Sequence, residues 1–195
     1  PTASPARISY RVRLIDACTH FNAERLSHHR CLARVAPFPS QHRLMTQVFV
    51  GIGSNIDPLR RVSEAVAALR SRFDVDVSPA FRGAAIGFDG PDFVNAVVGF
   101  ETDSSLQALL KCLKQIELQI GKDLSAPRYA SKVIDLDLLF FGTHTVCNDR
   151  LTLPRDLSEA TYYAAPISVL APDWVDPVSG RRLREIAEQH APSDG

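Results

Sequence analysis

Along residues 45–195, segments whose apolar residues have helical spacing alternate with segments of strand-forming residues. Apolar positions with helical spacing predict amphipathic helices over 58–72 and 105–120, and shorter apolar segments predict helices over 158–170 and 182–189. Runs of β-branched and aromatic residues predict strands over 48–52, 74–81, 93–100 and 133–141. A hairpin tip over 143–148 and a short extended return over 150–154 follow the last strand. The pattern predicts one α+β domain.

Turn and cap residues punctuate these elements. Asp57 is expected to cap the first helix, and Ser104 and Gly121 are expected to begin and end the second. Gly51 and Gly53 close the first strand, where a tight turn is favoured over a phosphate cradle. The resulting order, β-α-β-β-α-β, is that of a ferredoxin-like α+β sandwich.

The strand over 133–141 is unusual because two acidic residues interrupt it. As a central strand it places Asp135 and Asp137 on one face, with carboxylates about 7 Å apart. An unpaired buried charge costs several kcal/mol, and a divalent ion on that face removes the penalty. Hard oxygen ligands of this kind suit Mg²⁺ completed by nucleotide phosphates. A solvated edge strand explains the same spacing equally well.

Polar residues elsewhere suggest a ligand. Asn95 lies within an apolar strand, either satisfied by a structural hydrogen bond or reading the edge of a heterocycle that Phe93 stacks on. Glu117 lies near a helix C-terminus, where the helix dipole disfavours an acid. The loop over 122–132 carries three cations and one aromatic residue onto the aspartate strand. These cations are either ordinary surface charge or a triphosphate clamp.

Composition separates a leader from the domain. The chain has 195 residues, of which 45% are hydrophobic, and a net charge of 0. Residues 1–44 hold seven arginines, no lysine and two acids, which gives +5 and leaves −5 for the remainder. Met45 is the only methionine and directly precedes the first strand. We expect a domain over 45–195 and a leader over 1–44, disordered or outside the fold, that is a transit segment or upstream sequence without a role.

Location and partners follow from what the sequence contains. No apolar run is long enough to span a bilayer, and the leader lacks the apolar core of a secretory signal. The four cysteines have no metal-ligand spacing, so we expect reduced thiols. We expect a cytoplasmic monomer with small-molecule substrates and without nucleic-acid or membrane partners.

Five motifs resemble one enzyme family. They are Gly53-Ser54-Asn55, Pro91-Asp92-Phe93-Val94-Asn95-Ala96, Ile116-Glu117-Leu118-Gln119 with Gly121, Asp135-Leu136-Asp137 with Phe141-Gly142, and Arg150-Leu151-Thr152-Leu153-Pro154. In this order and spacing they resemble 6-hydroxymethyl-7,8-dihydropterin pyrophosphokinase over residues 45 to about 187. The resemblance implies a three-layered ferredoxin-like αβα sandwich with a mainly antiparallel sheet. It also implies transfer of pyrophosphate from ATP to a pterin hydroxymethyl group in folate biosynthesis, with release of AMP.

The same resemblance implies roles for individual residues. Asp135 and Asp137 match the aspartates that hold two Mg²⁺ ions, and with Lys132 they form the catalytic set. The pterin site would comprise Gly83, Ala84, Ile86, Phe93, Asn95 and Tyr163. The ATP site would comprise Glu117, Lys122, Tyr129, Lys132, Leu138, Arg150, Thr152 and Arg155.

The chain departs from the family pattern at several phosphate-facing positions. Tyr129-Ala130-Ser131-Lys132 stands where the family has Trp-Gly-Pro-Arg, and Arg155 stands where it has histidine. Leu124 and Thr161, or a neighbour of Thr161, replace arginines. The metal and pterin halves therefore match better than the triphosphate clamp, since lysine lacks the bidentate fork of arginine. The alternative function is a non-catalytic or altered-substrate paralogue that binds a pterin or nucleotide.

Overall fold

A six-stranded antiparallel sheet carries the fold in this computed structural model, which describes residues 13–15, 45–123, 125 and 130–190. The strand order is β1-β4-β5-β2-β6, and β3 also pairs with β5. The strands are β1 (Arg13–Ile15), β2 (Thr46–Ser54), β3 (Asp76–Val77), β4 (Ala80–Gly83), β5 (Phe93–Thr102), β6 (Asp135–Phe141), β7 (Val146–Asn148) and β8 (Leu151–Leu153). The helices are α1 (Pro58–Arg70), α2 (Leu106–Ile120), α3 (Thr161–Leu170) and α4 (Leu183–His190).

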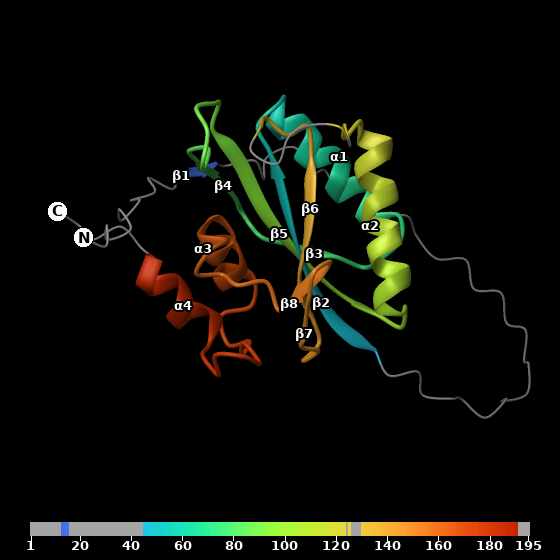
Figure 1. Ribbon diagram of the computed structural model, residues 1–195, viewed down its shortest axis with the longest axis vertical. Helices are drawn as coiled ribbons and strands as arrows, with labels where there is room; N and C mark the ends of the chain where they lie inside the picture. The colour runs from blue at the N-terminus through green and yellow to red at the C-terminus, as the bar shows by residue number, and fades with distance from the viewer. Residues whose placement is uncertain (1–12, 16–44, 124, 126–129, 191–195) are drawn as a thin grey trace, which may run out of the picture.

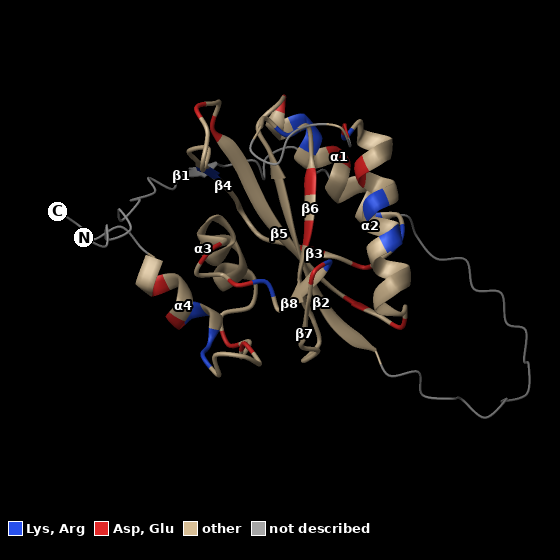
Figure 2. Ribbon diagram, viewed as in Figure 1, with Lys and Arg blue, Asp and Glu red and all other residues tan. Residues whose placement is uncertain are grey.

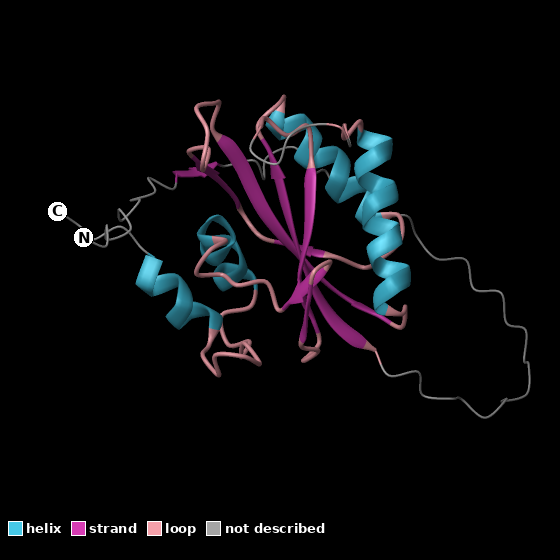
Figure 3. Ribbon diagram, viewed as in Figure 1, coloured by secondary structure: helices cyan, strands magenta, loops and turns pink. Residues whose placement is uncertain are grey.

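Helices cover both faces of this sheet (Figure 1). The pair α1 and α2 lies on one face, and α3 with α4 lies on the other, which gives three layers (Figure 3). The chain order β2-α1-β4-β5-α2-β6 and the antiparallel order β4-β5-β2-β6 confirm the predicted ferredoxin-like α+β sandwich.

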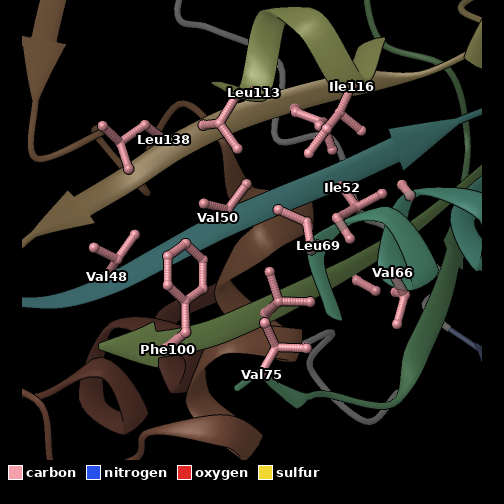
Figure 4. Packing of buried hydrophobic residues seen from close by; sticks show 14 of the residues in the cluster. Val48, Val50, Ile52, Val66, Leu69, Val75, Phe100, Leu113, Ile116 and Leu138 are labelled. Atoms are coloured by element: carbon pink, nitrogen blue, oxygen red, sulfur yellow. The ribbon is translucent and has the colours of Figure 1, made fainter. Parts of the chain in front are cut away.

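Two apolar cores fill the spaces between the layers. On the α1 and α2 side, Val50, Ile52, Leu69 and Ile116 belong to one buried cluster (Figure 4). On the α3 and α4 side, Phe49, Phe140, Tyr163 and Ile167 belong to the other. Because both faces are covered, successive residues of β2 and β6 are buried in turn, and the strands appear in the sequence as nearly continuous apolar runs.

Strand β6 is an edge strand, contrary to the central position predicted for it. Within the described part of the chain it pairs only with β2. Its long apolar run comes from burial on both faces, and not from strand neighbours on both sides. The pairs Phe49↔Phe140 and Val50↔Leu138 leave Leu139 as a bulge. The bulge is fixed from outside, because the Arg155 amide donates to the Leu139 carbonyl at 2.8 Å.

Gly51 and Gly53 lie inside β2 and not in a turn, so both interpretations of this pair were wrong. They pair with Asp137 and Asp135 of β6 on one side and with Val97 and Asn95 of β5 on the other. Glycine therefore stands beside each acidic residue in the middle of the sheet. It leaves space above β2 for side chains from other elements.

The predicted helix caps were only partly confirmed. Asp57 adopts φ 49° and makes no capping bond, forming an ion pair with Arg60 instead. Ser105, and not Ser104, accepts the capping bond of α2 from Ala108, whereas Gly121 ends this helix at φ 106° as predicted.

Two predicted segments are divided differently in the structure. The strand predicted over 74–81 is divided between β3 and β4. The predicted hairpin tip over 143–148 contains strand β7, which pairs with β8.

The leader is described only at Arg13–Ile15. This segment forms β1, which pairs with Ala80–Arg82 of β4. Residues 1–12 and 16–44 lie outside the described part, so the domain boundary at Met45 stays a prediction. Among the residues described, no helix has the length and apolar character needed to cross a membrane.

Candidate active site

The two aspartates of β6 share the sheet face that α3 and α4 cover. Figure 2 shows acidic positions along β6, and the register places Asp135 opposite Gly53 and Asp137 opposite Gly51. Their alternation with Leu136 and Leu138, which enter the α1 and α2 core, confirms the predicted division of faces. Both aspartates are only partly exposed. The edge strand is thus real, but its carboxylates are not simply solvated, because each has protein partners.

Asp137 lies between a tyrosine and an arginine. The Tyr163 hydroxyl donates to Oδ2 of Asp137 at 3.2 Å. Burial and repulsion from Asp135 raise the pKa of the Asp137 carboxyl, against the opposing attraction of Arg155. Burial by itself lowers the pKa of the Arg155 guanidinium, but attraction to Asp137 outweighs it and the net direction is upward. The charges of Asp137 and Arg155 therefore face each other at this site.

Asp135 is held by a lysine that it shares with a buried acid. Lys122 Nζ donates to Oδ1 of Asp135 and to Oε1 of Glu117. The same Glu117 oxygen accepts the Leu136 amide of β6 at 2.9 Å, and its partner oxygen accepts from Lys114 Nζ at 3.3 Å. Burial by itself lowers the pKa of Lys122, and the two carboxylates reverse this to a net increase. The hydrogen bonds of Glu117 thus offset the unfavourable interaction of its charge with the helix dipole. They connect β6 to α2 and hold Lys122 at Asp135.

Three of the predicted pterin-binding residues converge above Gly53. A Cβ on residue 53 would lie 3.0 Å from Asn95 Oδ1, 3.4 Å from the Tyr163 hydroxyl oxygen and 3.9 Å from Phe93 Cδ1. Gly83 pairs with Phe93 at the end of β4, and the segment with Ala84 and Ile86 follows it. The pterin candidates therefore lie close to the aspartates across β2.

The side-chain amide of Asn95 has no hydrogen-bond partner among the described residues, although the residue is only 4% exposed. This argues against the satisfied structural hydrogen bond that was the other interpretation of Asn95. The nitrogen and oxygen of this amide are not among the fully buried polar atoms without a partner, so the amide is accessible to water or to a ligand. A ligand with donor and acceptor groups at its edge can pair with the amide.

Asn55 connects the two loops beside the site, a role that sequence reasoning missed. Its Nδ2 donates to the Pro91 carbonyl at 3.1 Å and to Ser131 Oγ at 3.3 Å, and its Oδ1 accepts the Lys132 amide at 2.7 Å. The Ser54 hydroxyl donates to the Val133 carbonyl at 2.7 Å. Their membership of the Gly53-Ser54-Asn55 motif was the only signal in the sequence. These bonds hold the start of β5 and the approach to β6 together.

The remaining ATP candidates are less closely gathered. Leu138 is buried in the α1 and α2 core, on the opposite face from the carboxylates. Arg150 lies between β7 and β8, and Thr152 lies on β8. Tyr129 lies outside the described residues. The structure therefore brings Asp135, Asp137 and Lys122 together, and leaves the other ATP assignments as predictions.

The two carboxylates are the candidate ligands for a magnesium ion. Oδ1 of Asp135 and Oδ2 of Asp137 accept protein hydrogen bonds, so Oδ2 of Asp135 and Oδ1 of Asp137 have no hydrogen-bond partner within the described chain. The described residues contain no group of three or more potential metal ligands. Mg²⁺ commonly takes one or two carboxylates and completes its shell with water and phosphate oxygens.

A separate cavity of 710 Å³ lies near the start of β2 and the end of α3. Phe49, Gly99, Glu101 and Trp174 are among its lining residues, and the lining contains none of the candidate site residues. This cavity is therefore separate from the aspartate site.

Comparison with known proteins identifies the family of the chain. The family model of 7,8-dihydro-6-hydroxymethylpterin-pyrophosphokinase (HPPK) matches residues 49–172. A 2-amino-4-hydroxy-6-hydroxymethyldihydropteridine pyrophosphokinase of Synechocystis sp. is 33% identical over 165 residues, covering 81% of this chain and 83% of the relative.

Two further proteins with the same name are similar. The protein of Haemophilus influenzae is 31% identical over 153 residues, covering 75% of this chain and 94% of the relative. That of Pseudomonas aeruginosa is 33% identical over 151 residues, covering 73% and 91%. The chain belongs to the 7,8-dihydro-6-hydroxymethylpterin-pyrophosphokinase family.

Proposed function

We propose that this protein transfers pyrophosphate from ATP to 6-hydroxymethyl-7,8-dihydropterin in folate biosynthesis. The observation that carries the proposal is the side-chain amide of Asn95, which has no partner among the described residues and is not sealed from solvent, on the same sheet face as Asp135 and Asp137. An amide with a donor and an acceptor for the edge of a heterocycle thus lies across Gly53 from two carboxylates. This arrangement supports a reaction between a pterin and a metal-bound nucleotide.

The chemistry requires one bond to form and one to break. The pterin hydroxymethyl oxygen attacks the β-phosphorus of ATP, the bond from that phosphorus to the α-phosphate oxygen breaks, and AMP leaves. The hydroxyl proton passes to solvent. Two Mg²⁺ ions held by Asp135 and Asp137 would offset phosphate charge during this step. Positioning and electrostatics account for most of the catalysis in phosphoryl transfer, so no strong side-chain base is required.

The chain's own residues supply the remaining functions. Asn95 binds the pterin edge and Phe93 stacks on the ring, with Gly83, Ala84 and Ile86 beside them. Lys122 and Lys132 offset charge on the phosphates.

Arg155 supplies a guanidinium near the start of α3. It lies near Tyr162, the residue after Thr161, so a guanidinium is present there although Thr161 is not arginine. This relocated charge supports an active enzyme over the alternative of a non-catalytic or altered-substrate paralogue. The pyrophosphokinase names of the relatives support it too. The proposal extends to a cytoplasmic monomer without nucleic-acid or membrane partners.

The test is turnover by the full chain. With ATP, MgCl₂ and 6-hydroxymethyl-7,8-dihydropterin, chromatography should detect AMP and pterin diphosphate in equal amounts. The matched control is 6-methyl-7,8-dihydropterin, which has no hydroxyl and should give no AMP. Equal AMP release with both pterins, or no release with either, would contradict the proposal.

A further inference from the structure

Two adjacent tyrosines at the start of α3 lie at the site. The Tyr163 hydroxyl donates to Asp137 at 3.2 Å, and Tyr162 lies near the Arg155 guanidinium. The two rings lie 4.5 Å apart between centroids, with 61° between their planes. Of the two, Tyr163 is the one whose hydroxyl has a geometric hydrogen bond to a carboxylate of the site among the described residues.

The Tyr163 ring has little freedom to move. It is 1% exposed and belongs to the core beneath α3 and α4. It lies directly over Gly51, since a Cβ on residue 51 would fall 2.4 Å from Tyr163 Cζ. A ring packed this closely holds its hydroxyl at a defined point. The glycine of β2 is what makes this position possible.

The Tyr163 hydroxyl donates the one side-chain hydrogen bond that Asp137 receives within the described chain. A buried phenol needs an acceptor, and this need alone explains why a bond exists. It does not explain why the acceptor is Asp137, one of the two carboxylates of the site. Because the bond engages Oδ2, it also fixes the direction in which Oδ1 points.

We propose that Tyr163 is a positioning residue, whose hydroxyl turns Asp137 so that Oδ1 faces the metal. This inference rests on the proposed function, because it requires Asp137 to hold Mg²⁺. It adds a role for the hydroxyl to the pterin contact predicted for the Tyr163 ring. Hydrogen-bond partners of this kind fix metal ligands, and their loss commonly weakens metal affinity 10- to 100-fold.

The two tyrosines provide a matched pair of variants, because Tyr163→Phe and Tyr162→Phe each remove one hydroxyl. The full chain is titrated with MgCl₂ at fixed α,β-methylene-ATP, and nucleotide binding is measured by calorimetry. Tyr163→Phe should raise the Mg²⁺ concentration at half-saturation about tenfold. Nucleotide affinity at saturating Mg²⁺ should stay near wild type. Tyr162→Phe, the matched control, removes a hydroxyl that has no hydrogen bond to Asp137 and should leave the Mg²⁺ midpoint unchanged.

The outcomes separate this inference from the proposed function. A wild-type Mg²⁺ midpoint in Tyr163→Phe, or equal midpoint shifts in both variants, overturns the positioning role while leaving the enzyme's function intact. Nucleotide binding by wild type without any Mg²⁺ dependence overturns both. A second arm guards against general loosening of the fold: in an Asp137→Asn background, Tyr163→Phe should cause no further shift in the midpoint. A further shift of the same size would overturn the inference.

Discussion

Gly51→Ala places a methyl group where the ring of Tyr163 lies. The new Cβ would be 2.4 Å from Cζ, 2.6 Å from Cε1 and 2.7 Å from Cε2 of that ring. Carbon atoms pack favourably at about 3.5–4.0 Å, so the ring must move by about 1 Å. Tyr163 is buried, with 1% of its surface exposed. We therefore expect the substitution to cause both strain at residue 51 and a shift of the Tyr163 hydroxyl.

The cost has two parts. Overpacking a core of this kind typically costs about 1–3 kcal/mol. A shift of about 1 Å also breaks the 3.2 Å bond from Tyr163 to Asp137, and hydrogen bonds to charged groups contribute about 1.5–3 kcal/mol. Because the two effects overlap, we expect a total of roughly 2–5 kcal/mol. For a domain of this size that corresponds to a fall in melting temperature of roughly 5–15 °C.

Two other glycines serve as controls in the same thermal melts. Gly53→Ala places Cβ at 3.0 Å from Asn95 Oδ1, so a small loss of stability and a clear loss of pterin affinity are expected. Gly83→Ala meets nothing within 4 Å and should stay within about 0.5 kcal/mol of wild type. A double variant with Tyr163→Leu should recover part of the Gly51→Ala loss, because the ring is gone. If Gly51→Ala melts within 2 °C of wild type, on the order of 1 kcal/mol or less, the ring does not lie over β2 and the reasoning fails.

Three further predictions concern other parts of the chain. Asn95→Ala should weaken pterin binding by about 1–3 kcal/mol in calorimetry and leave ATP affinity nearly unchanged; equal weakening of both would make Asn95 a structural amide. A chain starting at Met45 should fold and bind ATP as the full chain does, whereas a loss of several degrees in melting temperature would show that the leader, β1 included, supports the domain. Without metal, the pKa of the Asp137 carboxyl is higher in the folded protein than in the unfolded chain. The folded protein is therefore more stable at low pH, where Asp137 is protonated, and loses this stability as the pH rises through the folded-state pKa. Asp137→Asn should therefore melt above wild type at pH 7 and converge with it in acid; a lower melting temperature at pH 7 would contradict this sign.

The sequence predicted what depends on local pattern. Helical spacing located α1 and α2, and alternation along β6 assigned Asp135 and Asp137 to one face. The edge position of β6 was not predictable in the same way, because strand composition reports burial and not the number of strand neighbours.

The missed features depend on contacts between distant segments. Gly51 and Gly53 resemble turn residues locally, yet their purpose is to leave space for Tyr163 and Asn95. Asn55 binds Pro91 and Lys132, which its own neighbourhood in the sequence does not reveal. Asp57 has the residue type of a cap, but its backbone conformation and its ion pair with Arg60 exclude the capping bond.

Separate Asp135→Asn and Asp137→Asn variants test the central claim most directly, with Mg²⁺-dependent nucleotide binding and turnover of ATP to AMP as the two measurements. Each change removes one anionic metal ligand and keeps the shape of the side chain. Because loss of one such electrostatic contact typically costs about 10²–10³ in rate, turnover should fall by at least that factor and the Mg²⁺ requirement should rise. Wild-type turnover with wild-type Mg²⁺ dependence in both variants would contradict the account.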